Sequence, residues 1–218
     1  REFVMFLDDD IYFKKNALKN IFDFIKKDKN SIGFGFNFSI KGINKISEFF
    51  KKNKFTKFLG IYDIKNGVVT PSGWQTKAIN LKKNQLVEWL PTGAVIYRYK
   101  YIENLKFDTS YGKYSYLEDL DFSYSLKKKG NLVICASAKF NTSISTPRNQ
   151  YYFGVREIVN RYYFVNKFNL SKINFFIGFM IFLLKHFIIL LSLKPSFFYR
   201  VVGNLHGILK IIFGYNKI

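Results

Sequence analysis

The sequence predicts an α/β fold of strands flanked by helices, because segments of strand length alternate with helical periodicity over residues 1–150. The apolar run Glu2–Leu7 has the length of a strand, and Ile32–Phe38 alternates with a period of two. Between them, apolar residues recur at helical spacing from Leu18 to Ile25. A strand, a helix and a second strand in this order are typical of one α/β unit.

The first strand is expected to lie in the interior of the sheet, since Phe3–Leu7 contains only apolar residues. The chain begins with Arg1 rather than methionine, and the strand starts almost at once. We therefore expect an N-terminal part to be missing. Asn16 is expected to cap the helix that follows, which ends near residues 28–30.

The middle of the chain is expected to form short elements joined by turns. We predict a short helix over 46–50, turns at 66–67 and 71–73, extended segments over 86–90 and 94–97, and one helical turn within 100–105. Gly93 separates the two extended segments and allows close approach of another group to the backbone.

The clearest helix covers Leu117–Gly130, because acids occupy its first turn, lysines occupy its last turn, and Gly130 stands where a C′ glycine belongs. This helix would project Glu118 and Asp119 from its N-terminus. A strand over 132–136 follows and contains Cys135. Cys135 is the only cysteine, so no disulfide forms within the chain, and a buried strand position is expected for it.

Residues 151–218 are predicted to form a separate, basic and apolar helical tail. Its segment 173–193 is long enough to span a bilayer, but Lys185 and His186 fall near its middle. Amphipathic helices lying at a membrane interface are therefore favoured over a clean span. The surrounding basic residues would attract anionic headgroups. The alternative is a buried helical hairpin in a soluble domain.

The charge balance is strongly positive, with 35 Lys and Arg against 15 Asp and Glu. Such a charge suits nucleic acid, anionic lipid or sugar nucleotides, although compositional bias with lysines on a solvated face also explains it. Beyond Asp121 only Glu157 is acidic, so the second half of the chain is the basic half.

Two acidic clusters are candidates for chemistry. Asp8, Asp9 and Asp10 follow the first strand, and carboxylates there can hold a hard divalent cation that bridges a diphosphate. Acidic triplets also occur in solvated turns. Residues 118, 119 and 121 could supply a general base at a helix start, or simply complement the helix dipole.

The order of these motifs resembles family 2 glycosyltransferases of the GT-A fold. The stretch 6–10, Phe-Leu-Asp-Asp-Asp, matches the DxD segment of that family, and Leu117–Phe122 matches its acidic catalytic helix. Trp89–Ala94 and Phe107-Asp108 lie between them in the same order. Tyr152, Phe153 and Arg156, followed by the apolar tail, resemble the rhamnosyltransferase-like members that build bacterial surface polysaccharides. Members normally begin with a nucleobase-binding half, which is expected to be absent here.

The resemblance implies a GT-A-like mixed sheet flanked by helices. It also implies an inverting, metal-dependent transfer. Asp8 and Asp10 would hold Mn²⁺ or Mg²⁺ on the donor diphosphate, and Asp9 would lie near the donor phosphates. Asp119 would deprotonate the acceptor hydroxyl, with Glu118 orienting the reacting groups. The acceptor side would be lined by Trp89, Thr92, Gly93 and Asp121.

The expected function is transfer of a sugar from a nucleotide-sugar donor to a saccharide or polyprenyl-linked acceptor in cell-surface polysaccharide synthesis. The resemblance implies a location on the cytoplasmic face of the bacterial inner membrane, against an anionic membrane surface, with no nucleic-acid partner. Two alternatives stay open. A metal-dependent phosphoryl-transfer enzyme acting on nucleic acid would also use acidic clusters and a positive charge. An inactive, truncated, membrane-associated remnant is the other.

Overall fold

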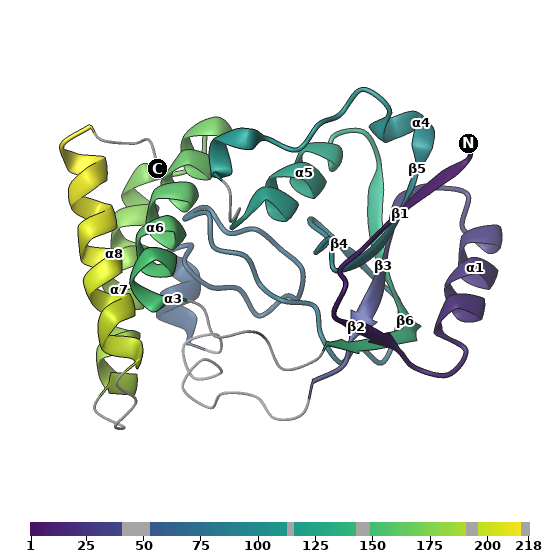
Figure 1. Ribbon diagram of the computed structural model, residues 1–218, viewed down its shortest axis with the longest axis horizontal. Helices are drawn as coiled ribbons and strands as arrows, with labels where there is room; N and C mark the ends of the chain where they lie inside the picture. Colours follow the sequence, from purple (N-terminus) through teal and green to yellow (C-terminus); the bar gives the residue numbers. More distant parts are fainter. Residues whose placement is uncertain (41–52, 113–115, 143–148, 191–195, 215–218) are drawn as a thin grey trace.

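A mixed sheet with helices on both faces and a bundle of helices beside it make up the computed structural model, which describes residues 1–40, 53–112, 116–142, 149–190 and 196–214 (Figure 1). The strands are β1 (Phe3–Leu7), β2 (Ile11–Phe13), β3 (Ser31–Phe38), β4 (Gln85–Val87), β5 (Ala94–Arg98) and β6 (Asn131–Thr142). The seven α-helices in these ranges are α1 (Ala17–Lys27), α3 (Lys54–Phe58), α4 (Tyr99–Ile102), α5 (Glu118–Leu126), α6 (Gln150–Lys167), α7 (Lys172–Leu190) and α8 (Ser196–Ile212). The helix expected over 46–50 lies outside the described residues.

The sheet has the strand order β1-β5-β3-β6-β2, with β4 also paired to β6. β3 and β6 run parallel, and the other pairs are antiparallel. The prediction of an α/β fold with a mixed sheet is therefore confirmed. One face packs against α1 through Ala17, Ile21 and Ile25. The opposite face packs against α5 through Phe122 and Leu126.

β1 is an edge strand, so the prediction that it lies in the interior of the sheet was wrong. It pairs only with β5 among the described strands, and its residues Phe3–Phe6 are half-buried. Alternate side chains of β1 join the two apolar layers, with Phe3 and Met5 on the α1 face and Val4 and Phe6 on the α5 face. An apolar run indicates that both faces are covered, but it does not tell whether both edges are paired.

Two helix ends differ from the sequence prediction. Asn16 precedes α1 with a left-handed backbone (φ 64°) and makes no side-chain cap. Helix α5 ends at Leu126, so Lys127–Lys129 lie beyond it, and Gly130 is not its C′ residue. Gly130 instead packs against Ile32, since a β-carbon at Gly130 would lie 2.6 Å from the Ile32 side chain.

The tail predicted as a separate unit shares apolar cores with the rest of the chain. α6 contributes Phe164 to a cluster with Trp89 and Leu120, and Phe175 of α7 stacks on Trp74. In the described part of the chain, no helix has both the length and the apolar character needed to cross a membrane.

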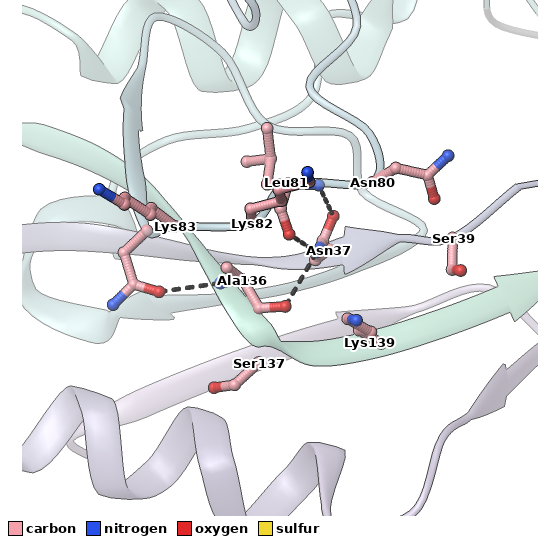
Figure 2. Close-up of a pocket in the computed structure, with 10 residues that line it drawn as sticks. Asn37, Ser39, Asn80, Leu81, Lys82, Lys83, Ala136, Ser137 and Lys139 are labelled. Atoms are coloured by element: carbon pink, nitrogen blue, oxygen red, sulfur yellow. Dashed lines mark hydrogen bonds between the residues drawn. The ribbon is translucent and has the colours of Figure 1, made fainter. Parts of the chain in front are cut away.

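Asn37 joins three segments at an irregularity of the sheet. The register between β3 and β6 shifts after Phe36, and the side chain of Asn37 fills the space (Figure 2). Its Nδ2 donates to the carbonyls of Leu81 and Ala136, both at 2.9 Å, and its Oδ1 accepts from Leu81 N at 3.0 Å. Asn37 is completely buried.

We expect Asn37→Ala to lower the free energy of unfolding by about 2–3 kcal/mol, because it leaves three buried backbone groups without a partner. Urea denaturation measures the change. The control is Asn20→Ala, which removes one exposed hydrogen bond to the carbonyl of Ser137 and should change stability by about 0.5 kcal/mol or less. Equal effects of the two substitutions would contradict this role of Asn37.

Candidate active site

The acidic triplet follows β1 at its C-terminal end. The backbone N–H of Asp8 donates to the carbonyl of Gly93 at 3.0 Å, which extends the β1–β5 ladder by one bond. Asp8 and Asp9 are exposed, and Asp10 is half-buried. Among the described residues, no lysine or arginine forms an ion pair with these three carboxylates.

The second acidic cluster lies at the start of α5. Leu117, immediately before the helix, has a left-handed backbone (φ 79°), and Glu118 and Asp119 are half-buried. The Asp119 carboxylate accepts from Leu120 N at 2.7 Å. The hydroxyl of Ser123 donates to the Asp119 carbonyl at 2.7 Å and accepts from Leu90 N at 3.0 Å. These bonds fix the first turn of α5 against the segment that leads into β5.

The two acidic clusters influence one another electrostatically. Burial raises the pKa of Asp8, and the negative charges of Asp10, Asp9 and Glu118 raise it further. Burial also raises the pKa of Asp119 to about 6, with further increases from Glu118 and Asp8. Phe6 of β1 and Phe122 of α5 pack with their ring centroids 5.9 Å apart, so the two segments that carry these carboxylates lie next to each other, although they are far apart in sequence. The described residues contain no group of three or more His, Cys, Asp or Glu that could hold a metal ion.

Asp121 has a different environment from its neighbours in sequence. It is 3% exposed, and its carboxylate accepts from Lys167 Nζ at 2.6 Å. Lys167 also donates to Asp108 at 2.7 Å, and Tyr163 donates to the same carboxylate at 2.9 Å. Burial acts to raise the pKa of Asp108, but the hydrogen bonds from Lys167, Ser110 and Tyr163 hold it well below its usual range.

This ion-pair cluster was not predicted from the sequence. Lys167 lies at the end of α6, and nothing in its neighbours distinguishes it from the other lysines. Asp121 and Asp108 were singled out in the sequence, Asp121 as a predicted acceptor contact and Asp108 as part of the motif order on which the resemblance rests, but their pairing through Lys167 was not predicted. Because Asp121 is buried and paired with Lys167, its predicted contact with an acceptor would require that pair to open.

The residues predicted to line the acceptor side lie between the two clusters in sequence and differ in exposure. Trp89 is 7% exposed, and its indole N–H donates to the Thr76 carbonyl at 3.1 Å. Its ring belongs to an apolar cluster with Leu120 at the base of α5. Thr92 and Gly93 are half-buried. A β-carbon at Gly93 would lie 3.2 Å from Asp8 Oδ2, so the group that approaches this glycine closely is the Asp8 carboxylate.

A pocket of about 800 Å³ lies elsewhere, beside the end of β3 and the middle of β6 (Figure 2). Its lining includes Asn37, Ser39, Lys82, Lys83 and Lys139, and it contains none of the acidic residues described above. The pocket and the two acidic clusters are therefore different sites.

Comparison of the chain with models of known protein families gives no match, and comparison with curated proteins gives none either. The geometry and electrostatics of the acidic site therefore carry the functional argument, together with the motif order.

Proposed function

We propose that the chain acts in inverting, metal-dependent glycosyl transfer of the GT-A type. The observation that supports this most is the packing of β1 against α5, in which the ring centroids of Phe6 and Phe122 lie 5.9 Å apart. The charge of Glu118 raises the pKa of Asp8, and the charge of Asp8 raises the pKa of Asp119. A donor diphosphate held at the strand end would lie next to a base at the helix start.

Asp8 and Asp10 are proposed to hold Mn²⁺ or Mg²⁺ together with the donor diphosphate. Magnesium is commonly bound through one or two carboxylates plus substrate phosphates, so a large protein cage is not needed. Among the described residues, Asp8, Asp9 and Asp10 have no basic partner, and they form a concentration of negative charge that a cation would neutralise. Burial and the charges of Asp10 and Asp9 together raise the pKa of Asp8. When bound, the metal would stabilise the charge of the departing diphosphate.

Asp119 is proposed to act as the general base. A pKa of about 6 is close to neutral pH, where a base can be ionised and still bind a proton effectively. Oδ1 of Asp119 accepts a hydrogen bond from Leu120 N. Oδ2 would accept the proton of the acceptor hydroxyl. Glu118 raises the pKa of Asp119 through its charge and would help to orient the acceptor.

The acceptor is proposed to lie over Thr92 and Gly93, the half-buried residues beside Asp8. Trp89 would support this surface, because its ring packs in the same apolar cluster as Leu120 of α5. Asp121 is proposed to position α5 through Lys167, in addition to the acceptor contact expected from the resemblance. A saccharide or polyprenyl-linked acceptor suits a site of this chemistry.

A donor assay tests the proposal. The full-length protein is incubated with UDP-, dTDP- and GDP-sugars and Mn²⁺, and release of nucleoside diphosphate is followed. We expect release from at least one donor, and a loss of about a hundredfold or more when EDTA removes the metal. Asp10→Ala should reproduce that loss, and Asp23→Ala, on the exposed face of α1, should not.

The same preparation separates the alternative functions. Metal-dependent cleavage of nucleic acid without release from any sugar nucleotide would favour phosphoryl transfer and contradict our proposal. No reaction with any donor in a folded preparation would favour a remnant without activity.

A further inference from the structure

One face of α7 is apolar and exposed along its length. Its exposed apolar side chains follow at spacings of three and four residues, which places them on one side of a helix. They are Ile173, Phe176, Met180, Leu184 and Phe187. The exposed fractions reach 74% at Ile173 and 63% at Met180, so these side chains are largely outside the core.

α8 carries a second stripe of the same kind. Its members are Phe198, Val202, Leu205, Leu209 and Ile212, again at alternating spacings of three and four. α7 and α8 pack against each other and stand side by side at the end of the molecule away from α1 (Figure 1). We call these ten residues the outer apolar face.

The inner faces of both helices are already buried. α7 inserts Phe175, Phe179 and Phe182 into the core around Trp74. α8 packs against α6 so closely that a β-carbon at Gly203 would lie 2.1 Å from a backbone oxygen of α6. A helix that is apolar on two sides normally packs against other groups on both sides, and exposed apolar side chains gathered on one side of a helix mark an interaction site.

The exposed charged side chains described around the outer apolar face are basic. Within the described residues of 150–214 the only carboxylate is Glu157, which is 3% exposed and bound by Arg200 at 2.7 Å and 3.0 Å. Lys172 is exposed at the start of α7, and Lys210 is half-buried in the last turn of α8. A second copy of the chain would bring like charges together here, whereas an anionic bilayer offers both apolar depth and opposite charge.

We propose that the outer apolar face docks α7 and α8 on the surface of an anionic lipid bilayer, with both helices lying in the interface. The apolar stripes would enter the boundary between headgroups and acyl chains, and the lysines would remain at the level of the headgroups. This inference does not depend on the proposed glycosyl transfer, and its test does not use activity.

Vesicle sedimentation tests this docking with the full chain. We expect binding to vesicles of phosphatidylcholine with phosphatidylglycerol, weaker binding to phosphatidylcholine alone, and weakening by salt. Leu184→Glu combined with Leu209→Glu should reduce binding at least about tenfold, because two leucines that are 54% and 50% exposed in solution would no longer enter the bilayer. Circular dichroism checks that the variant is folded.

The matched control is Leu18→Glu combined with Phe22→Glu, two exposed residues of α1 that give the same change of charge. It should bind vesicles as the unmodified chain does. A second pair, Ile173→Glu with Leu205→Glu, repeats the test with other residues of the outer apolar face. Equal binding of the test and control variants would overturn the proposal. A second result would also overturn the proposal: the unmodified chain does not bind vesicles and forms a dimer in light scattering, and the test variants are monomers.

Discussion

Asp119→Asn is expected to lower sugar transfer by about a hundredfold or more, because it removes the proposed base without changing the size of the side chain. The amide keeps an oxygen that can accept from Leu120 N, so the first turn of α5 should be retained. Steady-state rates with the donor found in the assay of sugar nucleotides measure the loss. Asp23→Asn, the same change on the exposed face of α1, should leave the rate unchanged.

Two further readouts separate a lost base from a disturbed fold. The unmodified chain should gain activity as the pH rises through about 6, since the carboxylate must be ionised to act. For stability the sign is opposite. A raised carboxyl pKa means that the ionised form is unfavourable in the folded state, so the contribution of Asp119 to stability falls as the pH rises from its ordinary pKa of 3.8 to its folded-state pKa of about 6. Without metal at pH 8, Asp119→Asn should therefore be as stable as the unmodified chain or more so. Near-normal turnover would remove Asp119 from the mechanism.

The sequence predicted most of the elements because their signals are local. Apolar periodicity located β1, α1, β3 and β6, and the acids at residues 118–121 located the start of α5. Cys135 is buried in β6, as its apolar neighbours indicated. The errors concern relations between elements: whether β1 has a partner on both edges, and where α5 stops once Leu126 has entered the core.

The same distinction between local signals and relations between elements applies to the candidate site. Asp8 and Asp119 could be selected from the sequence because carboxylates at a strand end and at a helix start have few other uses together. Lys167 could not be selected from the sequence, because its role depends on the packing of the end of α6 near Asp108 and Asp121. No local sequence pattern predicts that contact. Trp89 was selected for its aromatic face, but its burial depends on side chains contributed by α5 and α6.

Gly203→Ala is expected to lower the free energy of unfolding by about 3 kcal/mol, against the usual preference of helices for alanine. In an open helix the change would stabilise by up to about 1 kcal/mol. Here the new β-carbon would lie 2.1 Å from the Tyr151 carbonyl oxygen and 3.1 Å from Val155 N, and neither backbone atom can move without shifting α6. Overpacking of this kind outweighs helix propensity. Urea denaturation gives the free energy.

Gly207→Ala provides the graded comparison, since its β-carbon would lie 2.9 Å from the Val155 carbonyl oxygen, and its effect should be smaller, about 1 kcal/mol. Val202→Ala, on the exposed side of the same helix, should be close to neutral.

The packing of α8 against α6 also bears on function, because α6 carries Lys167, which holds Asp121 and Asp108 beside the acidic site. A shift of α8 away from α6 should therefore lower transfer as well as stability. If the Gly203→Ala chain were more stable than the Gly207→Ala chain, α8 could not be in close backbone contact with α6 at Gly203.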